Sequence, residues 1–238
     1  MVSDFPQQMS LGVSLHDTAT FDNFFIPPDS GNAQVVSALL KQLETSDASV
    51  VYLWGASGAG LTHLLQASCH EAERQNISAQ YLPLGELAGF DPAALLEGMA
   101  HFDLVCFDSI ESVAGNPQWD EALFNCFNQL RDLNKKMLFA SIYPPSQISV
   151  SLADLRSRLT WGETYQVVPL DDVEKVAALR SRAKGRGMVM SEEVGQFILN
   201  RAPRDMNDLF YLLDQLDEAS LQEQRKLTIP FIKQVLKL

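Results

Sequence analysis

The segment Gly55-Ala56-Ser57-Gly58-Ala59-Gly60-Leu61-Thr62 constrains the fold of this chain more than any other. It follows the phosphate-binding pattern G-x-x-x-x-G-K-[ST], with a leucine at the lysine position. The apolar run before it, residues 50–54, predicts a short buried strand, and residues 61–73 have the periodicity of an amphipathic helix. The segment therefore predicts a strand–loop–helix unit, in which backbone N–H groups and the positive end of the helix dipole surround a phosphate.

The leucine changes what such a loop can do. A hydrolytic enzyme uses the lysine ammonium to neutralise the β- and γ-phosphates in the transition state, and leucine carries no charge. We expect a site that holds a nucleotide but hydrolyses it poorly, with Thr62 as a candidate Mg²⁺ ligand. The alternative is a glycine-rich turn that binds no ligand. The loop residues predicted to bind the nucleotide are Gly55, Ser57, Gly58, Ala59, Gly60, Leu61, Thr62 and His63.

The charge of the chain limits its partners. The 238 residues carry a formal net charge of −12, whereas direct DNA binding depends on lysine and arginine to neutralise phosphates. We therefore expect protein partners. No apolar run approaches the ~20 residues of a membrane span, and the N-terminus lacks the basic start and apolar stretch of a secretory signal. Cys69, Cys106 and Cys126 are odd in number and widely spaced, which favours reduced thiols in a cytoplasmic protein.

Strand and helix patterns alternate over most of the chain, and only helical patterns follow. Apolar runs predict strands at 50–54, 79–84, 104–107, 137–141 and 165–168. Helical patterns lie between them, near 33–44, 61–74, 92–100 and 119–133. This alternation predicts an α/β fold, a three-layer base with a parallel sheet. A small all-helical lid is predicted from the patterns at 171–187, 191–202, 204–219 and 228–237. We therefore expect a flexible tail at 1–16, a base domain at 17–168 and a lid domain at 169–238.

An acidic motif follows the phosphate loop about 45 residues later. The run Leu104-Val105-Cys106-Phe107-Asp108 is an apolar strand that ends in an acid, and Asp108 is predicted to lie beside the loop and to hold Mg²⁺ directly or through water. Many such ATPases place a second acid next, to polarise the attacking water. Here Ser109 follows, and Glu111 comes two residues later, which further weakens the case for hydrolysis. Ser141 ends the next apolar strand, where it is either a sensor of the γ-phosphate or a polar turn residue.

Three arginines are candidates for work on a phosphate. Arg156 and Arg158 lie in residues 155–162, a segment expected to turn toward the last strand. We interpret Arg158 as an arginine finger that projects toward a nucleotide held by a neighbouring subunit; the alternative is a surface ion pair. Whether Arg156 shares this work stays open. Arg204 is expected to open a lid helix, where it is either solvated or able to reach back over the phosphates.

Taken in order, these motifs resemble those of the AAA+ family and, within it, of the bacterial replication initiator DnaA. Thr20-Phe21-Asp22-Asn23-Phe24 is similar to that group's opening box, and Asn32 falls where its base-binding segment continues, so the resemblance implies that Phe21 and Asn32 contact the nucleotide. Gly60-Leu61-Thr62-His63-Leu64-Leu65 matches the initiator's G-K-T-H-L-L except at the lysine. Ser157-Arg158-Leu159 is similarly distinctive. We expect no counterpart of the initiator's C-terminal DNA-reading domain, because the predicted lid extends to the last residue.

The N-terminal tail carries one further motif. Gln8-Met9-Ser10-Leu11-Gly12-Val13 resembles the hexapeptide that binds the sliding clamp, approximately Q-L-S/P-L-P-L. Met9 and Leu11 would be the apolar anchors, and Gln8 would supply polar contacts. Gly12 stands where the motif favours proline, which removes some preorganisation. With this tail, the whole chain resembles the DnaA-homologous regulators that inactivate the initiator.

This resemblance implies an action in trans. The protein would dock on a DNA-loaded clamp, the β subunit of DNA polymerase III, and contact the ATP-bound initiator, where Arg158 would promote hydrolysis in the partner's site. Its own nucleotide is implied to be a diphosphate such as ADP, with Mg²⁺ as a candidate companion ion. DNA would be contacted mainly through the clamp, and self-association into a homo-oligomer is a further expectation. Two alternatives stay open: an autonomous P-loop ATPase, such as an AAA+ motor or loader, and a nucleotide-independent interaction adaptor.

Overall fold

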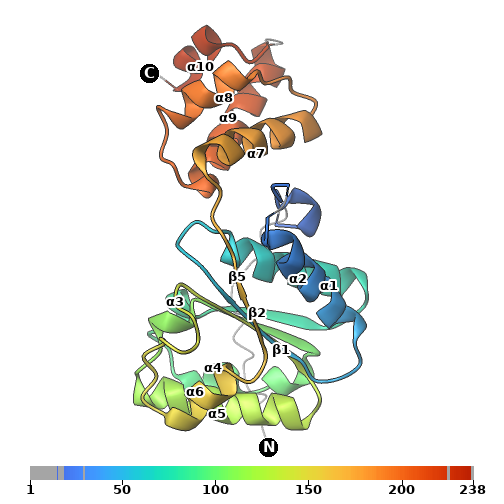
Figure 1. Cartoon of the computed structure of the whole chain (residues 1–238), viewed down its shortest axis with the longest axis vertical. Coiled ribbons are helices and arrows are strands. Elements are labelled where there is room, and N and C mark those ends of the chain that lie inside the picture. Colours follow the sequence, from blue (N-terminus) through green and yellow to red (C-terminus); the bar gives the residue numbers. More distant parts are fainter. Residues whose placement is uncertain (1–14, 16–18, 29, 224–225, 237–238) are drawn as a thin grey trace, which may run out of the picture.

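The centre of the protein is a five-stranded parallel sheet, seen in a computed structural model that describes residues 15, 19–28, 30–223 and 226–236 (Figure 1). The strands are β1 (Val50–Trp54), β2 (Ala79–Pro83), β3 (Leu104–Asp108), β4 (Lys136–Ser141) and β5 (Glu163–Gln166). They lie in the order β2-β3-β4-β1-β5, and every pairing is parallel. The loop after β1 therefore opens beside the carboxyl end of β4, which is where ligands bind in open α/β sheets.

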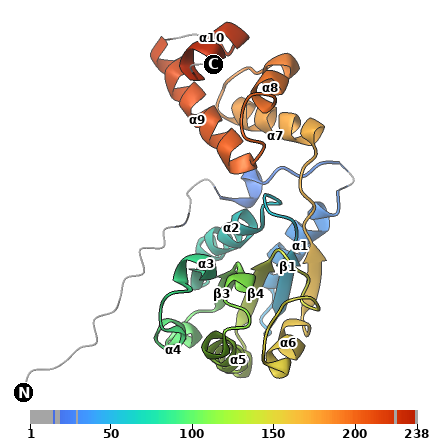
Figure 2. The same cartoon turned by 90° about the vertical axis from the view of Figure 1, so that its left-hand side faces the viewer.

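Helices cover both faces of the sheet, and four more form a separate C-terminal region (Figure 2). The helices of the sheet-containing part are η1 (Phe21–Asn23), α1 (Asn32–Glu44), α2 (Leu61–Arg74), α3 (Leu84–Leu87), α4 (Pro92–Leu96), η2 (Met99–His101), η3 (Ile110–Ser112), α5 (Pro117–Asp132) and α6 (Ala153–Leu159). Those of the C-terminal part are α7 (Asp172–Gly185), α8 (Glu192–Leu199), α9 (Met206–Glu223) and α10 (Ile229–Leu236).

The central strands are apolar on both faces because each face packs against helices. Side chains alternate along a strand, so that Val51 and Leu53 of β1 join the core under α1 and α2. Val50 and Tyr52 point the other way and join the core under α5 and α6. Near-continuous apolar runs of this kind are typical of parallel strands buried on both sides. The predicted three-layer α/β base with a parallel sheet is confirmed.

Three predicted elements differ from the observed ones. The last strand is Glu163–Gln166 rather than 165–168, because the chain beyond Gln166 leaves the sheet toward the C-terminal helices. The helix expected at 92–100 ends at Leu96, since Gly98 has a φ of 83° that an α-helix cannot contain. Residues 155–159, expected in a turning segment, belong to helix α6. In each of these places the apolar pattern of the sequence is weak. The element therefore begins or ends at a point that the pattern does not mark.

The C-terminal helices form their own apolar core. Leu209, Leu213 and Leu216 of α9 are fully buried, and they pack with Phe231 and Ile232 of α10. Helix α7 starts with a capping box, in which Asp171 accepts a hydrogen bond from the Glu174 N–H and the Glu174 side chain accepts one from the Asp171 N–H. This region lies beyond the carboxyl ends of the strands as a helical lid (Figure 1). The domain limits of 169–238 stay a prediction.

Across the described part of the chain, none of the helices has both the length and the apolar character needed to cross a membrane.

Candidate functional site

The phosphate loop joins β1 to α2, and its conformation depends on glycine. Gly58 and Gly60 have φ angles of 79° and 94°, in the left-handed region that residues with a Cβ rarely adopt. A Cβ on Gly55 would lie 2.3 Å from the carbonyl oxygen of Val167, so glycine is required where the loop leaves the sheet. The backbone can therefore curl tightly around the start of α2, whose first N–H groups have no partner within the helix.

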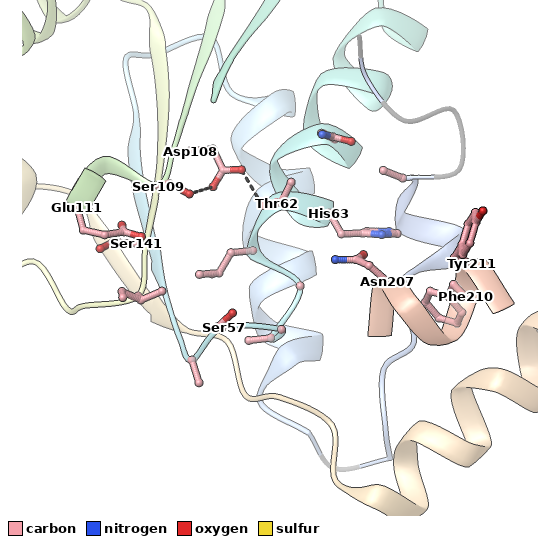
Figure 3. Close-up of a pocket in the computed structure, with 18 of the residues that line it drawn as sticks. Ser57, Thr62, His63, Asp108, Ser109, Glu111, Ser141, Asn207, Phe210 and Tyr211 are labelled. Carbon is pink, nitrogen blue, oxygen red and sulfur yellow. Dashed lines mark hydrogen bonds between the residues drawn. The ribbon is translucent and has the colours of Figure 1, made fainter. Parts of the chain in front are cut away.

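The loop borders a cavity of about 540 Å³ between the ends of the strands and the lid (Figure 3). This volume is in the range of small-ligand sites, ~300–1,000 Å³. The structure brings most of the predicted nucleotide-binding residues to it: Ser57, Gly58, Ala59, Gly60, Leu61, Thr62, His63, Asp108 and Ser141. Sequence reasoning missed the lid side of the cavity, which is lined by Arg182, Asn207, Phe210, Tyr211 and Asp214.

Asp108, at the end of β3, is buried and accepts hydrogen bonds from three hydroxyl groups. Thr62 Oγ1 and the Tyr81 hydroxyl each lie 2.7 Å from its Oδ2, and Ser109 Oγ lies 3.4 Å from its Oδ1. Burial raises the pKa of Tyr81 well above its usual range, and the Asp108 carboxylate adds to the rise. The Tyr81 hydroxyl therefore stays protonated and donates a hydrogen bond that holds the Asp108 carboxylate in place beside the loop.

Thr62 and Asp108 supply oxygen atoms of the kind that Mg²⁺ prefers. They are 46 residues apart in sequence, and the structure joins them directly. Among the described residues, no group of three or more His, Cys, Asp or Glu side chains is arranged to hold a metal ion. A Mg²⁺ ion at this position would therefore need phosphate oxygens and water to complete its coordination.

The residues after Asp108 do not form a second catalytic acid next to it. Ser109 has a φ of 56°, and its hydroxyl is turned to Asp108. Glu111, on η3, lines the cavity instead. Ser141 is fully buried at the end of β4, lines the same cavity and accepts a hydrogen bond from the Tyr143 N–H at 3.1 Å. Ser141 thus stabilises a turn and also faces the cavity, and its role as a sensor of the γ-phosphate stays a prediction.

Residues 20–24 are held against the start of α2 by His63. Its Nε2 lies 2.8 Å from the Thr20 carbonyl oxygen, and its ring lies 5.6 Å from that of Phe24. Burial lowers the pKa of His63, and the nearby Arg182 and His70 lower it further, against the rise caused by the Thr20 carbonyl. Accordingly, the neutral imidazole donates from Nε2.

Phe21 and Asn32, the two residues implied by the resemblance to contact the nucleotide, have different positions. Phe21 packs against the core under α1 and α2 and does not line the large cavity. Asn32 lines a smaller cavity of about 80 Å³, which shares Gly60 and His63 with the large one. However, the Asn32 amide already makes two hydrogen bonds to the backbone of Val168.

The lid contributes a cation that sequence reasoning did not identify. Arg204 is exposed, forms an ion pair with Asp172 at 2.9 Å and is not among the residues that line the large cavity. Arg182 of α7 lines the cavity, with its guanidinium carbon 4.5 Å from the centre of the Phe210 ring. No carboxylate of the described residues lies within ion-pair distance of Arg182. The nearby Asp214 is paired with Arg186. Arg182 is one of several basic residues of α7, and no sequence pattern distinguishes it from the others.

Arg156 and Arg158 lie in the last turn of α6, outside the protein's own cavity. The Arg156 guanidinium donates to the Val150 carbonyl oxygen at 3.0 Å. The Arg158 guanidinium makes no hydrogen bond or ion pair with the described residues. The predicted clamp-binding motif, Gln8 to Val13, lies outside the described residues.

The comparisons with known proteins identify both parts of the chain. The model of the bacterial DnaA ATPase domain matches residues 15–86 and 90–166, and the model of the Hda lid domain matches residues 172–236. Domain III of DnaA from Thermotoga maritima is similar over 94% of this chain and 98% of that chain, with a TM-score of 0.73 and 21% identity.

Two other solved structures share the fold. AMPPCP-bound DnaA from Aquifex aeolicus matches over 89% of this chain and 71% of that chain, with a TM-score of 0.71 and 21% identity. The RuvB branch migration motor of Thermotoga maritima matches over 92% of this chain and 71% of that chain, with a TM-score of 0.61 and 17% identity. At these identities the likeness shows the fold alone.

Fold, cavity and the two matching family models together define an AAA+ nucleotide-binding module, a P-loop base followed by a helical lid. The chain belongs to the DnaA-homologous AAA+ family, with the lid of the Hda group, a regulatory family involved in the control of replication initiation.

Proposed function

We propose that this protein is a nucleotide-bound, clamp-tethered regulator that stimulates hydrolysis of the ATP held by the DnaA initiator. The observation that carries the proposal is the position of Arg158 in a chain of this family. Arg158 lies at the end of α6, outside the protein's own cavity, and its guanidinium has no hydrogen-bond or ion-pair partner among the described residues. An arginine in this state is available to a phosphate on another molecule, and an arginine supplied in trans contributes ~10³–10⁵ in rate to phosphoryl transfer.

The protein's own nucleotide acts as a structural ligand in this proposal. The cavity, the glycine-dependent loop and the Thr62–Asp108 pair support nucleotide binding. Leu61 supplies no charge for the β- and γ-phosphates, and Ser109 is turned to Asp108 rather than to an attacking water. We therefore propose a diphosphate such as ADP, with Mg²⁺ at Thr62 and Asp108, and weak or absent intrinsic hydrolysis.

The same proposal assigns one contact to the sliding clamp and one to the initiator. Residues 8–13 dock on the sliding clamp, so that a chain with a net charge of −12 contacts DNA mainly through the clamp. The surface around Arg158 faces the initiator's nucleotide. The initiator becomes ADP-bound and does not start another round of replication. A homo-oligomer that covers Arg158 would be the inactive form.

The test is hydrolysis of ATP bound in advance to the initiator, with clamp-loaded DNA and either wild type, Arg158→Ala or Arg156→Ala. We expect wild type to stimulate hydrolysis and Arg158→Ala to lose the stimulation. Arg156→Ala removes the same charge two residues away and should keep most of it. Because the Arg158 guanidinium makes no hydrogen bond or ion pair with the described residues, its variant should bind ADP and unfold like wild type. Full stimulation by Arg158→Ala would refute the proposal.

A further inference from the structure

Glu111 occupies the end of the cavity where the strands terminate. It belongs to η3, which follows β3, and its side chain lines the same cavity as the phosphate loop (Figure 3). Ser141 of β4 lines the same cavity and lies close to Glu111 in Figure 3. Burial raises the pKa of Tyr52 to about 12, with a smaller contribution from the charge of Glu111, while Ser141 opposes the rise through a hydrogen bond.

One oxygen of the Glu111 carboxylate has no hydrogen-bond donor in the described part of the chain. Its Oε2 atom is inaccessible to water and has no hydrogen-bond partner among the described residues. A buried carboxylate oxygen without a donor is unfavourable, and its presence in a folded protein calls for an explanation. Asp108, by comparison, is surrounded by three hydroxyl donors. Glu111 therefore brings a negative charge to its part of the cavity, with one oxygen atom that no donor among the described residues offsets.

The position of this charge along a bound nucleotide follows from the loop. The backbone of a P-loop cradles the β-phosphate, and the loop threonine and an acid at the end of a later strand, here β3, would hold Mg²⁺ beside the β- and γ-phosphates. Thr62 and Asp108 therefore mark the place where a second phosphate ends and a third would begin. Glu111 and Ser141 lie at this end, whereas Arg182, the one lysine or arginine among the described lining residues, comes from the lid.

From this arrangement we infer that Glu111 is a specificity-determining residue, which makes the site accept a nucleoside diphosphate and disfavour the triphosphate. The inference rests on the proposed nucleotide site and assigns one residue to its choice of ligand. A third phosphate adds negative charge beside the Glu111 carboxylate, and Leu61 provides no ammonium to offset it. At separations of a few ångström and the effective dielectric constant of protein sites, ~20, one such repulsion weakens binding by at least about tenfold. A diphosphate ends before this point and avoids most of the repulsion.

The experiment measures binding of ADP and of a methylene-bridged ATP analogue to the isolated protein with Mg²⁺, by titration calorimetry. Wild type is compared with Glu111→Gln, which keeps the shape of the side chain and removes its charge. Glu121→Gln is the matched control, since Glu121 is an exposed residue of α5 that does not line the cavity. Glu111→Ala, which removes the side chain, provides a second variant if the amide disturbs the fold.

We expect the ratio of the triphosphate Kd to the diphosphate Kd to fall by about tenfold in Glu111→Gln and in Glu111→Ala, and to stay at the wild-type value in Glu121→Gln. An unchanged ratio in both Glu111 variants would overturn the inference. So would an equal gain in affinity for both nucleotides, which would mean that Glu111 acts on the whole ligand. If wild type binds neither nucleotide, the proposed nucleotide site fails as well. Initiator and clamp are omitted, so that the arginine finger is tested separately.

Discussion

Asn32 holds the backbone of Val168 through two hydrogen bonds of 2.9 Å, one to its carbonyl oxygen and one from its N–H. The residues are 136 positions apart. Asn32 is the first residue of α1 and is buried, and Val168 is the first exposed residue of the connection to the lid. The amide thus fixes the chain at the point where it passes from the base to the lid.

We expect Asn32→Ala to lower the free energy of unfolding by about 1–3 kcal/mol, because it removes both hydrogen bonds to the Val168 backbone, each of which contributes ~0.5–1.5 kcal/mol. Urea denaturation measures the change. Gln118→Ala, at an exposed position of α5, should lose less than about 0.5 kcal/mol. If Asn32→Ala were as stable as this control, the paired hydrogen bonds would not hold the connection in solution.

Leu61→Lys restores the residue that the phosphate pattern requires. Leu61 lines the cavity at the start of α2, so that an ammonium there would reach the β- and γ-phosphates. We expect the affinity for the methylene-bridged ATP analogue to rise by about tenfold, measured by calorimetry. Leu61→Met keeps the volume without the charge and should bind like wild type. An equal gain in both variants would show that shape rather than charge limits binding.

Arg182→Gln removes the cation that the lid presents to the cavity. Because Arg182 has no carboxylate partner within ion-pair distance among the described residues, we expect ADP affinity to fall by about tenfold. Arg180→Gln is the control, since Arg180 donates to the Met190 carbonyl oxygen and does not line the cavity. Arg204→Gln tests the role predicted for Arg204: a loss of ADP affinity would mean that Arg204 leaves Asp172 when the nucleotide binds.

His63 predicts a pH dependence of stability. Its pKa is lowered in the folded protein from the ordinary value of 6.5, chiefly by burial, so that below this value the unfolded chain binds a proton that the folded protein does not. Stability should therefore decrease as the pH falls from about 6.5 toward the folded pKa. His63→Gln should lose less stability over this range than wild type, while His101→Gln should follow wild type. Thermal unfolding between pH 5 and 8 measures the difference, and identical profiles would refute the assignment.

The repeating parts of the fold could be predicted from the sequence because they depend on local periodicity. Four of the five strands coincide with the predicted runs to within a residue or two, and the lid helices start near Asp171 and Ser191, which the structure shows as N-caps. Helix α6 was missed, since only Leu155 and Leu159 mark its buried side. Seven residues contain too few apolar positions to establish a helical period.

For the site, the sequence by itself determined the phosphate loop, Thr62 and Asp108, because each belongs to a motif in which neighbours along the chain fix the geometry. Only the tertiary structure decided which side chains face the loop from elsewhere. It placed Arg182 at the cavity and Arg204 on Asp172, turned Glu111 inward without a donor, and used the Asn32 amide to hold Val168. These relationships depend on how separate elements pack against one another. Contacts between residues far apart in sequence produce no periodic pattern in the sequence, so they could not be predicted from it.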